Sequence, residues 1–205
     1  MANHTDTVPA KKSRLCFFQQ FLKHPKEIGS VIPSSSYLER RIIEMAEVHS
    51  CSTVVELGSG TGGTTRAILR ALPRYGKLLS IEINPRFHQL TKAIGDQRLI
   101  AHHGSAADLG DILRQYDLPA PDAVISGIPF STMPEELGRL IIRQIAENLA
   151  PHGRFVAYQF NPKVYHLCTP VMGKCKSKLE VLNIPPMRVY RWEKRNGHRP
   201  CGCKG

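Results

Sequence analysis

The sequence has 205 residues, of which 41% are hydrophobic and 22% are charged, so its composition predicts a globular chain and excludes a disordered or collagen-like one. Its 28 Lys and Arg residues outnumber 17 Asp and Glu residues, which gives a formal net charge of +11. Such an excess attracts nucleic acid or an anionic membrane surface, and composition does not choose between them. No apolar run approaches the ~20 residues of a membrane span, so we expect any membrane contact to be peripheral.

The cysteines predict a reducing compartment. Six are present without a CxxC pair, and the start MANHTDTVPAKK lacks the apolar segment of a secretion signal. We therefore expect free thiols and a cytoplasmic protein. Cys201-Gly202-Cys203 offers two soft ligands where a structural metal site normally takes four, so we expect no metal.

Residues 1–51 differ in character from the rest and are expected to form an N-terminal helical lid and membrane-contact segment. The stretch KKSRLCFFQQFLKHPKEIG (residues 11–29) gathers its apolar and aromatic residues on one side of a helix, with lysines and glutamines opposite. Such a helix either lies in an anionic lipid interface or covers the cofactor site with its apolar face. Ser34–Ser36 predict an N-cap for the helix YLERRIIEMAEV (residues 37–48).

From residue 52 to residue 205 the chain is expected to form one α/β unit. Short β-rich runs alternate with helical patterns, which is typical of a doubly wound sheet. The last two strands flank Pro185-Pro186, so we expect a hairpin that adds an antiparallel strand to an otherwise parallel sheet. Five helical links are predicted, including a helix over 134–149, and the seven predicted strands are 53–57, 77–83, 98–103, 122–127, 153–160, 178–184 and 188–194.

The stretch VVELGSGTGGTTR (residues 54–66) follows the first predicted strand and fits two glycine patterns. One is GxGxxG, the dinucleotide fingerprint, which ends at Gly63, and the other is ExGxGxG, which begins at Glu56. Both place a flexible turn at the edge of the sheet where open α/β folds bind ligands. The Glu56 carboxylate disfavours a pyrophosphate and suits a ligand with a sulfonium and an ammonium group. S-adenosylmethionine carries both.

A second acid stands at the end of the second predicted strand. Glu82 follows the glycines by about 20 residues, where a carboxylate can accept hydrogen bonds from ribose hydroxyls. Proteins that bind NAD share this feature, so Glu82 does not discriminate between the two cofactors. A dehydrogenase is the least favoured reading because of Glu56.

ELGSGTGGTT together with SIEINP resembles motif I and the acidic second-strand end of class I S-adenosylmethionine-dependent methyltransferases. The resemblance covers Thr53–Lys194 and implies a Rossmann-like fold with a seven-stranded, mostly parallel sheet and helices on both faces. It also implies S-adenosyl-L-methionine as methyl donor and S-adenosyl-L-homocysteine as product. Ser105 stands where the family often carries an Asp that meets adenine. The cofactor-binding residues implied are Glu56, Gly58, Ser59, Gly60, Gly62, Thr64, Glu82, Ile83, Ser105, Ala106 and Ser126.

SGIPFSTMP (residues 126–134) follows the fourth predicted strand, where this family places the methyl acceptor. It resembles the N-[LI]-P-[YF] signature of enzymes that methylate adenine or other planar amines, such as ribosomal RNA adenine dimethylases. The Asn that would hold the exocyclic amine is replaced by Gly127. Ile128, Pro129 and Phe130 are expected to form a rigid apolar wall, and a turn with its aromatic ring packed inward is the alternative.

FLKHPKEIGSVIPSSSYLERRI, ELGSGTGGTT and SGIPFSTMP, in this order, are similar to bacterial phospholipid N-methyltransferases, which convert phosphatidylethanolamine stepwise to phosphatidylcholine. The resemblance implies SN2 methyl transfer to a lipid amine at the inner face of the membrane. It suggests substrate-binding roles for Gly127, Ile128, Pro129, Phe130, Lys163, Arg188 and Arg191, the last three as partners of the phosphodiester. Candidates for taking the amine proton or orienting the nitrogen are Tyr37, Tyr158, Tyr165 and His166.

Two other functions remain open at this point. An RNA adenine N6-methyltransferase is favoured by the +11 charge and the IPF turn, and Gly127 counts against it. A non-catalytic lipid-binding module that keeps the fold is disfavoured by the intact glycine motif. The phospholipid N-methyltransferase is the first hypothesis, with no nucleic acid partner expected.

Overall fold

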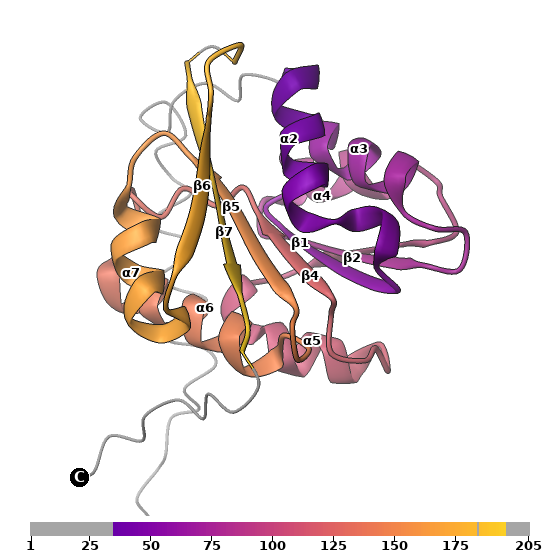
Figure 1. The fold of residues 1–205 in the computed structure, drawn as a ribbon. Coiled ribbons are helices and arrows are strands. Elements are labelled where there is room, and N and C mark those ends of the chain that lie inside the picture. Colours follow the sequence, from indigo (N-terminus) through magenta and orange to yellow (C-terminus); the bar gives the residue numbers. More distant parts are fainter. Residues whose placement is uncertain (1–34, 184, 196–205) are drawn as a thin grey trace, which may run out of the picture. The chain divides into compact units, whose positions relative to one another are not determined.

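The computed structural model describes residues 35–183 and 185–195. They contain a seven-stranded sheet with the order β3-β2-β1-β4-β5-β7-β6 (Figure 1). Strands β1 to β5 pair in parallel, and β7 runs antiparallel to both of its neighbours. The strands are β1 (Thr53–Leu57), β2 (Lys77–Glu82), β3 (Leu99–His103), β4 (Ala123–Ser126), β5 (Arg154–Gln159), β6 (Cys175–Glu180) and β7 (Met187–Glu193).

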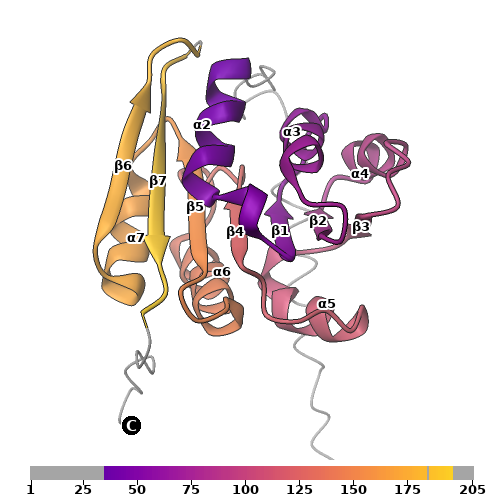
Figure 2. The same ribbon diagram turned by 45° about the vertical axis from the view of Figure 1, so that its right-hand side comes forward.

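Helices cover both faces of this sheet (Figures 1 and 2). On one face lie α2 (Ser36–Ala46), α3 (Gly63–Ala71) and α4 (Pro85–Lys92), and on the other lie α5 (Leu109–Gln115), α6 (Glu135–Asn148) and α7 (Lys163–Met172). Two short 3-10 helices, η1 (Val48–Ser50) and η2 (Ala106–Asp108), complete the elements. The predicted α/β fold class, the five helical links and the closing antiparallel hairpin are confirmed.

The sixth strand differs from its prediction. The sequence predicts a strand over residues 178–184, whereas β6 spans Cys175–Glu180. After Glu180, side chains replace backbone pairing: Leu182 N donates to Glu180 Oε1 (3.1 Å), and the buried Asn183 side chain donates to Pro185 O (2.8 Å). The predicted strand is therefore placed too late in the chain.

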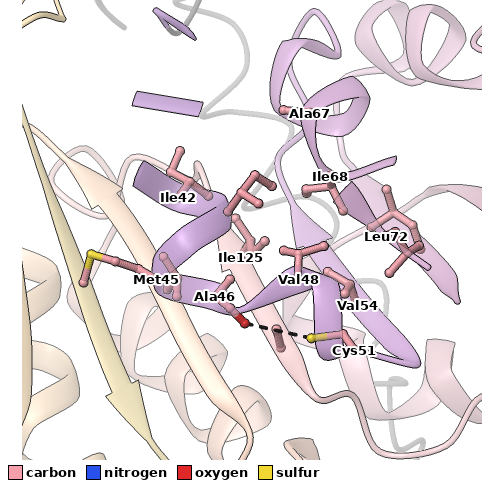
Figure 3. Close-up of a cluster of buried hydrophobic side chains, with 14 of the residues drawn as sticks. Ile42, Met45, Ala46, Val48, Cys51, Val54, Ala67, Ile68, Leu72 and Ile125 are labelled. Atoms are coloured by element: carbon pink, nitrogen blue, oxygen red, sulfur yellow. Dashed lines mark hydrogen bonds between the residues drawn. The ribbon is translucent and has the colours of Figure 1, made fainter. Parts of the chain in front are cut away.

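The helix α2 is fastened to the sheet by its apolar side. Ser35 caps it, as the serine run predicts, and its hydroxyl accepts from Leu38 N. Ile42, Met45 and Ala46 enter a fully or nearly buried cluster with side chains of η1, β1, α3 and β4 (Figure 3). Burial of this apolar surface stabilises the packing of α2 on the domain. The amphipathic segment predicted over residues 11–29 and the Cys201-Gly202-Cys203 tail lie outside the described residues.

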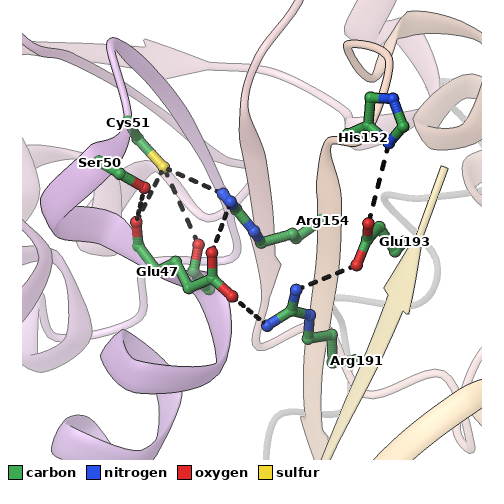
Figure 4. A network of polar contacts seen from close by, with 8 residues as sticks. Glu47, Ser50, Cys51, His152, Arg154, Arg191 and Glu193 are labelled. Atoms are coloured by element: carbon green, nitrogen blue, oxygen red, sulfur yellow. Dashed lines mark hydrogen bonds and ion pairs between the residues drawn. The ribbon is translucent and has the colours of Figure 1, made fainter.

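A charged network ties the end of α2 to β5 and β7 (Figure 4). Glu47 follows α2 in the left-handed region (φ 52°), and its two carboxylate oxygens meet Arg154 and Arg191, each at 2.6 Å. Arg191 also contacts Glu193 at 3.1 Å. Although partial burial opposes it, the hydrogen bonds and charges of the two arginines hold the pKa of Glu47 below its ordinary value.

Replacing Glu47 by Ala leaves two largely buried guanidinium groups without their shared partner. We expect the free energy of unfolding to fall by about 1–3 kcal/mol, between the ranges for exposed and buried ion pairs. The matched control is Glu44→Ala, which removes a more exposed partner of Arg41 and is expected to cost less than about 0.5 kcal/mol. Urea unfolding at neutral pH measures both variants.

The same comparison has a defined dependence on pH. Because the folded-state pKa of Glu47 is lowered, its contribution is present above the ordinary carboxyl range and is lost as the pH falls through the folded pKa. The wild type and Glu47→Ala should therefore converge in acid. A difference that persists unchanged at low pH would contradict an ionic origin.

Candidate functional site

The turn between β1 and α3 adopts the conformation that one of the two glycine patterns demands. Gly58, Gly60 and Gly62 have φ values of 79°, 53° and 83°, in the left-handed region that favours glycine. Gly63 is already the first residue of α3 and has no positive φ. The backbone therefore requires the glycines of ExGxGxG, and the third glycine of GxGxxG carries no such demand.

This glycine turn contacts the loop that follows β4. Gly58 N donates to Ile81 O and Gly127 N donates to Leu57 O, each at 2.9 Å. A Cβ atom at Gly58 would lie 3.3 Å from Ile128 Cγ1. The glycine turn and the SGIPF loop therefore form one site at the carboxyl ends of the parallel strands, where open α/β sheets bind ligands.

The carboxylate of Glu82 joins the glycine turn to the start of α4. Its Oε2 atom accepts from Gly60 N (3.0 Å), and its Oε1 atom accepts from Asn84 N (2.8 Å). Asn84 in turn caps α4 by accepting from Arg86 N. Glu82 thus reaches the tip of the turn from the neighbouring strand.

The carboxylate of Glu56 is almost fully buried, with a relative exposure of 1%. Its Oε2 atom accepts from Thr65 Oγ1 and from Ser80 Oγ, each at 2.7 Å, while Oε1 has no protein partner among the described residues. Burial raises the pKa of Glu56 to about 7, which the hydrogen bonds oppose and the charge of Glu82 reinforces. A buried carboxylate oxygen without a partner is costly and favours a cationic ligand.

Tyr158 brings a hydroxyl from β5 to the same place. Its side chain is half-buried, and its hydroxyl lies 3.3 Å from Thr64 Oγ1 at the start of α3. Burial raises the pKa of Tyr158, the hydrogen bond to Thr64 opposes this, and the charges of Glu56, Glu82 and Glu39 raise the pKa further. The phenol therefore stays protonated at neutral pH and is unsuited to act as a base.

Gly127 makes room for this hydroxyl. A Cβ atom at position 127 would lie 2.3 Å from the Tyr158 hydroxyl oxygen, 2.9 Å from its Cζ atom and 3.1 Å from Gly58 O. Real Cβ atoms do not approach this closely, so no side chain at position 127 is compatible with Tyr158 where it stands. The sequence shows that Asn is missing at this position, and the structure supplies the physical reason.

The SGIPF loop is fixed from two sides. Ser126 Oγ accepts from Ile128 N (3.3 Å), and Gln159 donates to Ile128 O (2.8 Å). Phe130 is fully buried, so its ring packs inward as the alternative reading of this turn states, while Ile128 and Pro129 stay half-buried. The part of the loop that borders the glycine turn is therefore Ile128.

The remaining predicted cofactor residues line neighbouring elements. Ser59 is buried and accepts from Thr91 Oγ1 at 2.7 Å. Ser105 uses its hydroxyl to begin η2 by accepting from Ala107 N, and Ala106 is buried beside it. The carbonyl of Ile83 meets His103 Nε2 at 3.0 Å.

The structure brings some of the predicted acceptor residues to this edge. Lys163 donates to Met133 O (3.1 Å), which places the start of α7 against the loop after β4. Tyr165 and His166, in the first turn of α7, are exposed with ring centroids 5.5 Å apart. Arg188 is exposed in β7 opposite Gln159.

Two other predicted residues are engaged elsewhere. Arg191 is held by Glu47 and Glu193 toward the amino end of β5, so the structure does not bring it to the glycine turn. Tyr37 lies in the first turn of α2, 46% exposed, with the Arg40 guanidinium 5.6 Å from its ring centroid.

Sequence reasoning missed the residues that hold the site in shape. Thr65 and Ser80 fix Glu56, Gln159 fixes the SGIPF loop, and Glu39 adds its charge near Tyr158. Ser80 leaves a signal in the sequence, since it is a polar residue in the middle of β2 and such residues need a buried partner, whereas Gln159 is the last residue of β5, where a polar side chain is ordinary. Glu39 leaves none, because its position depends on how α2 packs.

Comparison with known proteins adds the family. No protein-family model matches the sequence. The ornithine lipid N-methyltransferase of Singulisphaera acidiphila is 31% identical over 182 residues, which cover 87% of this chain and 95% of that protein. The chain belongs to the class I S-adenosylmethionine-dependent methyltransferases. Within this family it is an N-methyltransferase by its similarity to that relative, and the predicted cofactor is confirmed.

More distant similarities agree with this assignment. The dimethyladenosine transferase of Chaetomium thermophilum is 32% identical over 121 residues, which cover 58% of this chain and 30% of that protein. Among solved structures, an O-methyltransferase of Bacillus cereus in complex with SAH has a TM-score of 0.64 at 10% identity and covers 92% of this chain and 94% of its own. A putative O-methyltransferase of Klebsiella pneumoniae has a TM-score of 0.62 at 15% identity, covering 92% and 91%. These structures share the fold.

The residues of the glycine turn and its neighbours fit S-adenosylmethionine. The left-handed glycines leave the backbone of the turn without side chains, and Glu56 Oε1 is a buried carboxyl oxygen without a partner among the described residues. Within residues 35–183 and 185–195, no three His, Cys, Asp or Glu side chains are grouped to hold a metal ion. The donor set therefore suits an organic cation, with Glu56 and Glu82 as its carboxylates.

If Glu56 faces the cationic cofactor, the affinity of the protein for S-adenosylmethionine depends on pH. The free carboxyl has a pKa of about 7 and binding favours its ionised form, so we expect affinity about tenfold weaker at about pH 6 than at about pH 8. Glu56→Gln should bind more weakly and lose this dependence, and calorimetric titration measures both. Glu44→Gln is the matched control. A variant Glu56→Gln with wild-type affinity at about pH 8 refutes the assigned role.

Proposed function

We propose that this N-methyltransferase acts on the amine of a membrane lipid. The sequence resemblance predicts phosphatidylethanolamine and its methylated derivatives as acceptors, leading to phosphatidylcholine. The name of the Singulisphaera acidiphila relative adds ornithine lipid as a second acceptor with the same chemistry. Both acceptors present a primary aliphatic amine beside an anionic group.

The observation that carries this proposal is the pair Gly127 and Tyr158. An Asn that clamps the exocyclic amine of adenine needs a Cβ atom at position 127, and the Tyr158 hydroxyl lies 2.3 Å from that point. A planar base therefore loses its clamp. A flexible aliphatic amine needs no planar clamp and can be oriented by one hydroxyl oxygen.

The charges around the site support an amine acceptor. Besides burial, the charges of Glu56 and Glu82 raise the pKa of Tyr158, and both carboxyl groups are buried at the glycine turn of a chain with net charge +11. Such a site attracts an ammonium group. The phosphate or carboxylate of the headgroup needs cations, which the exposed Arg188 and the half-buried Lys163 provide at the same edge of the sheet.

The chemistry requires a neutral amine. S-adenosylmethionine, when bound, supplies a methyl group on a positively charged sulfur. Tyr158 keeps its own proton because its pKa is raised, so we assign it to orienting the amine by accepting an N–H hydrogen bond. Ile128 and the SGIPF loop limit the access of water, since Gln159 and Ser126 hold that loop against the glycine turn.

Labelled S-adenosylmethionine distinguishes the acceptor classes. The protein is incubated in parallel with phosphatidylethanolamine vesicles, ornithine lipid vesicles and unmodified ribosomal RNA, and the label in each is counted. We expect label in lipid. The distant dimethyladenosine transferases make RNA the second candidate, and label in RNA but not in lipid refutes the proposal. Label in neither favours the non-catalytic module.

Removing the hydroxyl of Tyr158 tests its role in orienting the amine. Tyr158→Phe keeps the ring and its packing, so we expect unchanged cofactor affinity and a kcat for lipid methylation lower by roughly tenfold or more. The control is Tyr116→Phe, which removes a hydroxyl that bonds His102 (3.1 Å) outside the glycine turn. Gly127→Asn should displace Tyr158 and reduce kcat similarly. A wild-type kcat in Tyr158→Phe would overturn the assignment.

The proposed place of action is the cytoplasmic face of the membrane. Among the described residues, no helix is both long and apolar enough to cross a bilayer. Contact through the basic amphipathic segment predicted over residues 11–29 is part of this proposal. Deleting residues 1–23 should abolish sedimentation with anionic vesicles if that segment makes the contact, and preserved sedimentation would leave it the role of a lid.

A further inference from the structure

The turn between β6 and β7 reverses the usual arrangement of polar and apolar side chains. Val181 and Leu182 are 61% and 57% exposed, whereas the polar side chains of Glu180 and Asn183 are each 5% exposed. Turns normally place polar groups outward and apolar ones inward. This turn therefore exposes aliphatic surface that its own folding leaves unburied.

Hydrogen bonds hold the turn in this arrangement. Asn183 Oδ1 accepts from Ser35 N (2.9 Å), and its Nδ2 atom donates to Pro185 O (2.8 Å). Glu180 accepts from Leu182 N through Oε1 and from Arg41 through Oε2. Because the polar side chains are engaged with α2 and with the turn itself, Val181 and Leu182 are kept outward.

More exposed apolar and cationic side chains stand on the adjoining ends of β5, β6 and β7. Leu179 in β6 is 49% exposed and pairs with Arg188 of β7, which pairs in turn with Gln159 at the end of β5. Phe160 follows directly and is 73% exposed. Lys178 and Arg188 are also exposed, on opposite faces of the hairpin, because Lys178 precedes Leu179 in β6 and Leu179 pairs with Arg188. We call this set the hairpin-tip surface: Phe160, Lys178, Leu179, Val181, Leu182 and Arg188.

The hairpin-tip surface lies at the same edge of the sheet as the site formed by the glycine turn and the SGIPF loop. β7 begins where β5 ends, and Gln159, the register partner of Arg188, also holds the SGIPF loop through Ile128 O. Figure 1 shows the β6–β7 turn beside the start of α2, at the carboxyl ends of the parallel strands. A flat partner that covers the turn would therefore face the site.

We propose that the hairpin-tip surface docks on an anionic lipid bilayer. Aliphatic and aromatic side chains enter the interface while Lys178 and Arg188 meet lipid phosphates, which is the combination that peripheral membrane binding uses. Nucleic acid is a poorer match, since its bases stack on aromatic rings and give Val181 and Leu182 nothing to bury against. The docking itself does not require the proposed function. Its purpose does rest on that function, since docking would present the site to a lipid headgroup.

The test uses the full chain and vesicles of phosphatidylcholine with and without phosphatidylglycerol. These vesicles contain no primary amine lipid, so binding is measured apart from the reaction. We expect binding that requires phosphatidylglycerol and that falls by about tenfold or more in the double variant Val181→Asp/Leu182→Asp, because two inserted aliphatic side chains are lost. Wild-type binding by the double variant overturns the proposal.

The matched control is Tyr75→Asp. Tyr75 is 72% exposed and precedes β2 at the opposite edge of the sheet, so its variant replaces an exposed hydrophobic side chain by one carboxylate, against two in the double variant, away from the hairpin-tip surface. It should bind vesicles like the wild type. An equal loss in Tyr75→Asp would show that added negative charge alone weakens binding, which also overturns the proposal.

A second measurement does not depend on the double variant folding well. The chain has one Trp, and Trp192 is fully buried. In the variant Leu182→Trp, the new indole should shift its emission to shorter wavelength when phosphatidylglycerol vesicles are added. The wild type provides the baseline. An unshifted emission under conditions in which the protein sediments with vesicles places the contact elsewhere and rejects the proposal.

The outcomes separate this proposal from the proposed function. If vesicle binding depends on the hairpin tip and no lipid is methylated, the docking surface stands and the proposed function falls. If lipid in detergent micelles is methylated and the double variant still binds vesicles, the proposed function stands and the docking surface falls. If the double variant instead dissociates a concentration-dependent dimer with vesicle binding unchanged, the occupant is a second copy of the chain.

Discussion

The close approach of Gly127 to the Tyr158 hydroxyl is the constraint on which the acceptor side of this site depends. The loop after β4 lies directly against the glycine turn, and the ring from β5 fills the space that a side chain at position 127 would take. Nothing larger than glycine is compatible with that arrangement. Glycine at position 127 therefore removes the amide that would hold adenine and leaves room for the Tyr158 hydroxyl. This is the physical basis for favouring an aliphatic amine over adenine.

The chain is basic as a whole and acidic at the glycine turn, and this distribution of charge suits methyl transfer to a lipid amine. The chain carries a formal charge of +11, yet the buried carboxyl groups of Glu56 and Glu82 lie at the glycine turn and their charges raise the pKa of Tyr158. Cationic surface attracts anionic lipid, while the local carboxylates attract a sulfonium and an ammonium. The burial of Glu56 adds a dependence on pH, because it raises the pKa to about 7 and a cation beside this carboxyl favours its ionised form.

Much of the fold was readable because periodicity and glycine patterns are local. The seven strands, the Ser35 cap and the choice of ExGxGxG over GxGxxG all follow from short stretches of sequence. The residues that depend on tertiary packing were not readable. β6 ends earlier than predicted because the side chains of Glu180 and Asn183 take over hydrogen bonding in the turn. Arg191 is engaged by Glu47 because α2 ends beside β7. The contact of Tyr158 with position 127 joins β5 to the loop after β4 and leaves no signal in either stretch of sequence.

A crystal structure of the protein with S-adenosylhomocysteine and a short-chain amine lipid tests the central claim most directly. The quantity to measure is the distance from the acceptor nitrogen to the Tyr158 hydroxyl oxygen. The account predicts a hydrogen bond of about 3 Å between them, with Gly127 making room and the amine facing the glycine turn. An amine held by other groups, with the Tyr158 hydroxyl still bonded only to Thr64, would contradict it.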